Sequence, residues 1–221
     1  MAAVSGSTGP SRRRRETSGS LSEAAYRLLK WQILSLEIAP GSFLNEQDLA
    51  ASTGFGRTPI HQALHRLQYD GLVEIRPRKG VIVRSWSPAD VRCLIEVRRP
   101  LEEAMVRLAA ERAAEPEIVA ARKLLATGRP MIEAGDREGL LRLDHAFHGA
   151  IAAMARNPVL AEVVESLHQR STLLWFLPVS DQPEYEAVQK QHEAILAGIS
   201  ARDGVAAARA MRVHLESFLP S

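Results

Sequence analysis

One stretch of the chain, residues 54–83, constrains the possible fold more than any other. Its first half predicts a helix that begins near Arg57, because Thr58 can cap a helix and Pro59 fits a first turn. Apolar side chains then recur at helical spacing and form one stripe. These are Ile60, Ala63, Leu64 and Leu67.

The other face of this predicted helix is polar and has no carboxylate from Arg57 to Tyr69. DNA phosphates attract cations and repel carboxylates, so such a face suits a DNA groove. We therefore predict a recognition helix, with Arg57, Thr58 and His61 nearest the bases. The neighbouring side chains predicted to contact DNA are His65 and Arg66.

A β-hairpin is predicted directly after this helix. Two short runs rich in β-branched residues, 72–75 and 81–83, flank a basic turn from Arg76 to Gly80. A basic hairpin behind a recognition helix is typical of a winged helix, so we expect Arg78, Lys79 and Gly80 at the DNA backbone. The pattern alone also fits a small α+β domain that does not bind DNA.

Two further helices are predicted upstream. Ser22 is the predicted cap of the first, and Asn45 caps a second helix over residues 46–53, with Leu44 in the connection before it. Gln47, in the first turn of the second helix, joins the predicted DNA contacts. This order of helices and hairpin predicts a winged helix-turn-helix over residues 21–84.

The N-terminal part resembles the GntR family of bacterial transcription regulators over residues 22–84. The matching pieces are Ile38-Ala39-Pro40-Gly41, Leu44-Asn45-Glu46, Leu49-Ala50, Gly54, Arg57-Thr58-Pro59, Ala63-Leu64, Arg66-Leu67, Asp70-Gly71-Leu72-Val73 and Lys79-Gly80. Members usually carry Arg-Glu where this chain has His61-Gln62, so a fixed positive charge is missing. The resemblance implies DNA binding, and the departure at His61-Gln62 implies that either the operator sequence or the affinity differs from the family's usual one.

Charge divides the chain of 221 residues into a basic and an acidic part. Residues 1–86 hold 12 Lys and Arg against 7 Asp and Glu, whereas residues 87–221 hold 16 against 19. Residues 1–20 are predicted to form a disordered basic tail, whose arginines either add phosphate contacts or are simply solvated. The sequence contains no apolar run of about 18 residues, so no membrane span is predicted. We expect a cytoplasmic protein.

After a linker at residues 85–87, residues 88–221 show only helical periodicity. The predicted helices cover residues 88–114, 116–134, 137–155, 158–176, 183–200 and 204–218. The fold is therefore expected to be mainly α, with the winged helix followed by an all-α bundle of six to seven helices. Cys93 lies in an apolar helical run and is expected to fill the core.

A metal site is suggested within this bundle. Asp144 and His148 are four residues apart on one helix, and His192 and His214 lie on later helices. One carboxylate and three imidazoles suit zinc, nickel or manganese. The same residues also fit a surface hydrogen bond and ordinary buried histidines.

The bundle resembles the FadR-type ligand-binding (FCD) domain over residues 88–219. The matching residues are Arg98, Leu101, Glu102, Asp144, Phe147, His148, Asn157, His192 and His214. The resemblance implies a divalent metal ion, zinc foremost, held by Asp144, His148, His192 and His214. It also implies that Arg98 binds a small organic acid as effector. His145 and His168 are expected to be surface or pocket-lining residues.

These features together predict a homodimeric, ligand-responsive transcription regulator, in this family most often a repressor, whose partner is double-stranded operator DNA. Two alternatives remain. A three-histidine, one-aspartate site could activate water in a metal-dependent hydrolase, although no motif places a general base. The bundle could also be a metal-free structural domain behind a winged helix.

Overall fold

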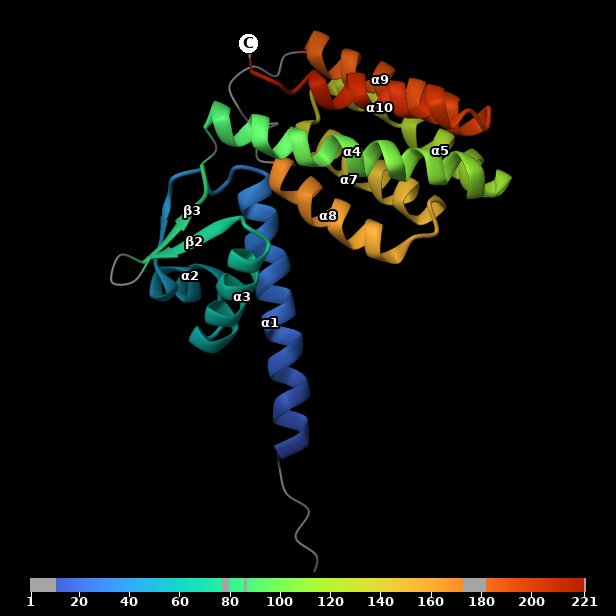
Figure 1. The fold of residues 1–221 in the computed structure, drawn as a ribbon. Helices are drawn as coiled ribbons and strands as arrows, with labels where there is room; N and C mark the ends of the chain where they lie inside the picture. The colour runs from blue at the N-terminus through green and yellow to red at the C-terminus, as the bar shows by residue number, and fades with distance from the viewer. Residues whose placement is uncertain (1–10, 77–79, 86, 173–181, 221) are drawn as a thin grey trace, which may run out of the picture. The chain divides into compact units, whose positions relative to one another are not determined.

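The computed structural model describes residues 11–76, 80–85, 87–172 and 182–220. The chain divides into two compact units, with the boundary between residues 85 and 86. The N-terminal unit contains a small sheet and helices, and the described part of the second unit is helical (Figure 1). The predicted fold class, a winged helix followed by a helical bundle, is therefore confirmed.

The N-terminal unit is built on three helices and an antiparallel sheet. The helices are α1 (Ser11–Leu34), α2 (Glu46–Thr53) and α3 (Arg57–Tyr69). The strands are β1 (Phe43–Leu44), β2 (Val73–Arg76) and β3 (Gly80–Val83), in the order β1-β3-β2. Its core includes the apolar stripe of α3 predicted from the sequence, together with Leu29 and Ile33 of α1.

Two predicted helix caps are wrong. Ser22 lies inside α1, where its hydroxyl donates to the Gln62 side chain, because the helix continues back to Ser11. Thr58 is a helical residue, and Gly56 is the N-cap of α3, without a side-chain bond. Residues 11–20 are helical where the sequence predicts disorder, since adding turns to an existing helix avoids the cost of nucleation. Residues 1–10 lie outside the described residues.

The prediction for Leu44 is also wrong, because Leu44 pairs with Val81 and Phe43 with Ile82 in the β1–β3 ladder. A strand of two residues has no periodicity of its own, and its partner lies far along the chain. The tip of the hairpin, with Arg78 and Lys79, falls outside the described residues. Gly80 begins β3 with a φ of 93°, which favours glycine.

The C-terminal unit is an all-helical bundle in the part described. Its helices are α4 (Pro88–Arg112), α5 (Glu115–Ala126), α6 (Gly128–Ala134), α7 (Arg137–Met154), α8 (Pro158–Thr172), α9 (Gln182–Ser200) and α10 (Gly204–Glu216). Ser87 and Asp90 form a capping box at the start of α4, and Asp203 caps α10. The core gathers around Phe147 and Ile151 of α7.

One predicted helix, residues 116–134, is in fact two. Pro130 lacks the N–H that would bond to the carbonyl of Ala126, and α5 ends at Ala126.

Cys93 is exposed rather than buried, because it lies beside the inward stripe of α4. The close approach of α9 and α10 depends on Gly198, where a Cβ would lie 2.6 Å from the Ala207 nitrogen. This contact helps to bring His192 and His214 together.

Candidate functional site

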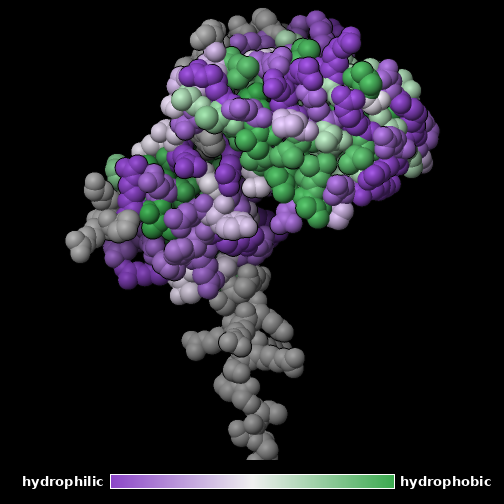
Figure 2. Space-filling model, in the orientation of Figure 1, coloured by the Kyte–Doolittle hydropathy of each residue, from purple (hydrophilic) through white to green (hydrophobic). Residues whose placement is uncertain are grey.

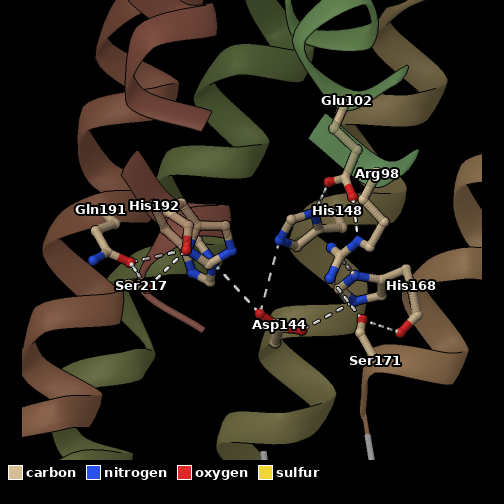
Figure 3. Close-up of polar contacts among 10 residues, drawn as sticks. Arg98, Glu102, Asp144, His148, His168, Ser171, Gln191, His192 and Ser217 are labelled. Carbon is tan, nitrogen blue, oxygen red and sulfur yellow. Dashed lines mark hydrogen bonds and ion pairs between the residues drawn. The ribbon is translucent and has the colours of Figure 1, made fainter. Parts of the chain in front are cut away.

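The bundle interior contains a cluster of one carboxylate and three imidazoles. Asp144 and His148 come from α7, His192 from α9 and His214 from α10, and all four side chains are buried. One ligand atom from each lies within 4.8 Å of the others. Figure 3 shows His148 and His192 on either side of the Asp144 carboxylate. The structure therefore brings together all four residues predicted as metal ligands.

Several polar atoms of this cluster are buried without a well-aligned hydrogen bond in the described part of the chain. They are both carboxylate oxygens of Asp144, both ring nitrogens of His148 and Nε2 of His192. Asp144 Oδ1 lies 3.4 Å from His192 Nε2 and 3.8 Å from His148 Nε2. Leaving such atoms buried and unsatisfied is costly. A divalent cation bound by Asp144, by one ring nitrogen of His148 and by His192 Nε2 would satisfy most of these atoms, and carboxylate and imidazole together suit zinc.

A second layer of polar groups fixes the orientation of two imidazoles. His148 Nδ1 lies 3.3 Å from Glu102 Oε2, and His214 Nδ1 lies 3.0 Å from Gln191 Oε1. A proton on each Nδ1 leaves Nε2 with its lone pair directed at the cluster. A carboxylate or amide oxygen behind a ligating histidine is the usual arrangement in metal sites.

Arg98 lies in this second layer, with a side chain that is only 3% exposed. Its Nε donates to Glu102 Oε1 at 2.6 Å, and its Nη1 donates to Ser171 Oγ at 2.7 Å. Its Nη2 is 3.2 Å from Nδ1 of His168. The predicted effector-binding arginine therefore sits beside the cluster and is engaged by its own chain.

Two residues of the site were missed or misjudged at the sequence level. The sequence assigns Glu102 no role of its own and predicts that His168 is a surface or pocket-lining residue. His168 is buried, and its Nε2 lies 3.0 Å from Asp144 Oδ2. The helical spacing of Val164, His168 and Ser171, which are all buried, was the available signal.

Both buried carboxylates favour the ionised form. Burial alone would raise the pKa of Asp144, but His168 and His148 beside it outweigh burial and hold that pKa well below its usual value. Burial would likewise raise the pKa of Glu102, yet Arg98 and His148 lower it.

Two histidines of the cluster favour the neutral form that binds metals. Burial lowers the pKa of His192 to about 3 and takes the pKa of His214 well below its usual value. An ionised Asp144 and neutral His192 and His214 are in the protonation states that metal binding requires.

The N-terminal unit presents the second set of predicted site residues. Arg57, Thr58, His61 and His65 are exposed on α3, and Gln47 is exposed on α2. The His61 Nδ1 lies 2.9 Å from Glu46 Oε1, and the His61 and His65 rings are in edge contact.

Arg66 behaves differently from the other polar residues of α3. It forms an ion pair with Glu23, and its guanidinium lies 3.8 Å from the centre of the Tyr26 ring. Both partners belong to α1. The side chain is therefore directed at α1 rather than along the face that carries Arg57.

Each of the two units matches a known protein family or domain. Residues 21–83 match the family described as bacterial regulatory proteins, gntR family, and residues 93–217 match the FCD domain. The chain belongs to the GntR family. It is a transcription regulator with an FCD domain.

Relatives and solved structures agree with this assignment. The HTH-type transcriptional repressor RspR of Escherichia coli is 28% identical over 201 residues, which cover 91% of this chain and 88% of the relative. The Nta operon transcriptional regulator of Aminobacter aminovorans is 34% identical over 137 residues, 62% of this chain and 65% of the relative.

The structure of E. coli McbR/YncC superposes with a TM-score of 0.80 at 23% identity, covering 89% of this chain and 94% of that one. A putative GntR regulator from Rhodococcus gives 0.77 at 22%, covering 90% and 95%. At these identities the similarity concerns the fold alone. Among the described helices, none is long and apolar enough to cross a membrane.

Proposed function

We propose that this regulator is a homodimeric repressor whose operator binding is controlled by a small carboxylate at a buried metal ion. Asp144, His148, His192 and His214 would hold the ion, with zinc foremost and nickel or manganese as alternatives. The observation that carries this proposal is the cluster of buried, poorly satisfied donor atoms that converge from α7, α9 and α10. The orientation of His148 and His214 by Glu102 and Gln191 supports it.

The charges of the site favour an anionic effector only when a metal is present. Glu102 is paired with Arg98, so Asp144 is the carboxylate in the cluster without a permanently charged partner. A divalent cation would turn an excess negative charge into an excess positive one, which attracts a carboxylate in a buried site. Metal binding would therefore precede effector binding.

Arg98 supplies a second anchor for the carboxylate. Among the described residues, the contacts to Glu102, Ser171 and His168 use only part of its N–H donors, and the others could bind an incoming anion. A guanidinium can hold a carboxylate in a bidentate geometry.

DNA binding is assigned to the exposed face of α3 and to the wing. Arg57, Thr58 and His61 would read base edges, whereas Gln47 and the wing residues 78–80 would contact the backbone. Two such units in a dimer would read two half-sites of an operator. The effector acts only if it binds one arrangement of the dimer more tightly than the other.

The homodimer is supported by an apolar surface on the C-terminal unit. Figure 2 shows a continuous hydrophobic region over α8 and the adjoining part of α4. Val97 of α4 and Val159 and Val163 of α8 are 50%, 72% and 44% exposed. An apolar patch of this kind marks an interaction surface more often than a solvated one.

The metal proposal is tested by comparing wild type with His192→Ala and with Lys190→Ala, an exposed residue of the same helix. Zinc content after purification without chelator should fall in His192→Ala and not in Lys190→Ala. Operator binding without effector should remain, while the response to an active carboxylate is lost. Full zinc content in His192→Ala would contradict the assignment.

A further inference from the structure

His168 bridges the metal cluster and the Arg98 layer. It projects from α8 into the bundle, with its Nε2 3.0 Å from Asp144 Oδ2 and its Nδ1 3.2 Å from Arg98 Nη2 (Figure 3). Its ring is stacked on that of His148 at a centroid distance of 4.3 Å. Yet it is not part of the set of four residues whose ligand atoms lie within 4.8 Å of one another. Its position is therefore behind a ligand rather than among the ligands.

The chemistry of its two neighbours determines where the His168 proton lies. A guanidinium can donate hydrogen bonds but cannot accept them, so the Nδ1 that faces Arg98 must accept. A neutral imidazole then carries its proton on Nε2, the nitrogen that lies 3.0 Å from Asp144 Oδ2. In both contacts the N–H group points toward Asp144, from Arg98 to His168 and from His168 to Asp144.

The two carboxylate oxygens of Asp144 therefore face different neighbours. Oδ2 lies 3.0 Å from His168 Nε2, whereas Oδ1 faces His192 and His148 at 3.4 Å and 3.8 Å. The oxygen that faces the other ligands is the one left for a cation. Without His168 the carboxylate could rotate, and both oxygens would compete for the ion.

We propose that His168 is a positioning residue that holds Asp144 for monodentate metal binding through Oδ1 and couples this ligand to Arg98. The inference rests on the proposed metal function. An anion that draws the Arg98 guanidinium away from His168 Nδ1 would weaken the bond that orients Asp144. Metal binding and anion binding are thereby linked through a single imidazole.

The test measures zinc affinity of the full chain by competition with a chelator, without effector or DNA. His168→Phe keeps a ring to stack on His148 but removes both nitrogens, and His168→Gln keeps a donor and an acceptor. We expect zinc affinity to fall by roughly 10–100-fold in His168→Phe, as for other residues behind metal ligands. His168→Gln should recover most of this loss. Lys190→Ala, at an exposed residue of α9, should leave zinc affinity unchanged.

A second measurement keeps the proposal falsifiable if His168→Phe folds poorly. The ring nitrogen shifts of His168 in the metal-free wild-type protein should report a proton on Nε2 and none on Nδ1. A proton on Nδ1 would overturn the proposal, as would wild-type zinc affinity in folded His168→Phe. If both His168→Phe and His192→Ala keep full zinc affinity, the proposed metal site itself is wrong. If His192→Ala loses zinc affinity and His168→Phe does not, only the role of His168 is refuted.

Discussion

The guanidinium of Arg66 lies 3.8 Å from the centre of the Tyr26 ring, so the last turn of α3 is fastened to α1. Glu23 pairs with the same guanidinium, and the Tyr26 hydroxyl donates to Asp70 at the end of α3. These contacts join α1 to the C-terminal end of α3. They show that Arg66 holds the end of α3 against α1, and its predicted contact with DNA stays a prediction.

Replacing Arg66 should therefore destabilise the N-terminal unit. Arg66→Ala removes the contact with the Tyr26 ring and the pair with Glu23, and should lower the free energy of unfolding by about 1 kcal/mol. Urea unfolding of the full chain measures the change. Arg57→Ala is the matched control, because Arg57 is exposed on the same helix and no described contact engages it. Equal stability of the two variants would contradict the role of Arg66.

Tyr26 should make stability depend on alkaline pH. Burial and the bond to Asp70 raise the pKa of its hydroxyl above the ordinary value of 10.0. The folded chain thus keeps a proton that the unfolded chain loses, so this stability is complete below pH 10 and declines as the pH rises beyond it. Tyr26→Phe should remove that part of the decline in unfolding experiments between neutral and alkaline pH. An identical decline in both proteins would refute the prediction.

Arg57→Ala should weaken operator binding by roughly 1–3 kcal/mol if the side chain contacts a base. The effect arises from lost recognition, since its stability should match that of wild type. Titrations with operator DNA and with unrelated DNA at several salt concentrations distinguish a contact to a base from a contact to a phosphate. An equal loss on both DNAs, with a shallower salt dependence, would instead place Arg57 at a phosphate.

Gln191 should support metal binding without being a ligand. Its amide oxygen accepts from His214 Nδ1 at 3.0 Å and so directs Nε2 at the cluster. Gln191→Ala should lower zinc affinity by about 10–100-fold in a chelator competition. Gln191→Glu retains an acceptor at this position and should bind zinc far better than Gln191→Ala. Similar losses in both variants would indicate that the hydrogen bond is not the cause.

The apolar surface of α8 should be required for dimer formation. Val163→Glu places a charge within this surface, and its burial in an interface would be costly. Sedimentation at several protein concentrations should show a shift toward monomer. Val119→Glu, at an exposed valine of α5, is the control and should not change the mass.

Local patterns predicted most of the helices because their causes are local. The apolar stripe of α3, the cap of α2 at Asn45 and the breaks at Gly135 and Asp203 all follow from short-range spacing and turn chemistry. The start of α1 could not be predicted in this way. Ser22 has the chemistry of a cap, but it is buried against α3 and bonded to Gln62, far along the chain.

The four proposed metal ligands could be named from the sequence, because a pair at helical spacing and two later histidines matched the pattern of a family. The residues of the second layer could not be named from the sequence. Glu102, His168 and Gln191 acquire their roles only when α4, α8 and α9 pack around α7, which brings residues distant in sequence to within hydrogen-bonding distance.

The sequence by itself determined the family, the helical character of the second unit and the identity of the buried donors. Only the tertiary structure decided that Arg66 fastens α3 to α1 and that His168 stands between Arg98 and Asp144. The physical reason is that residue chemistry and helical phase are local properties. The partner of a buried polar group is decided by which helices pack together.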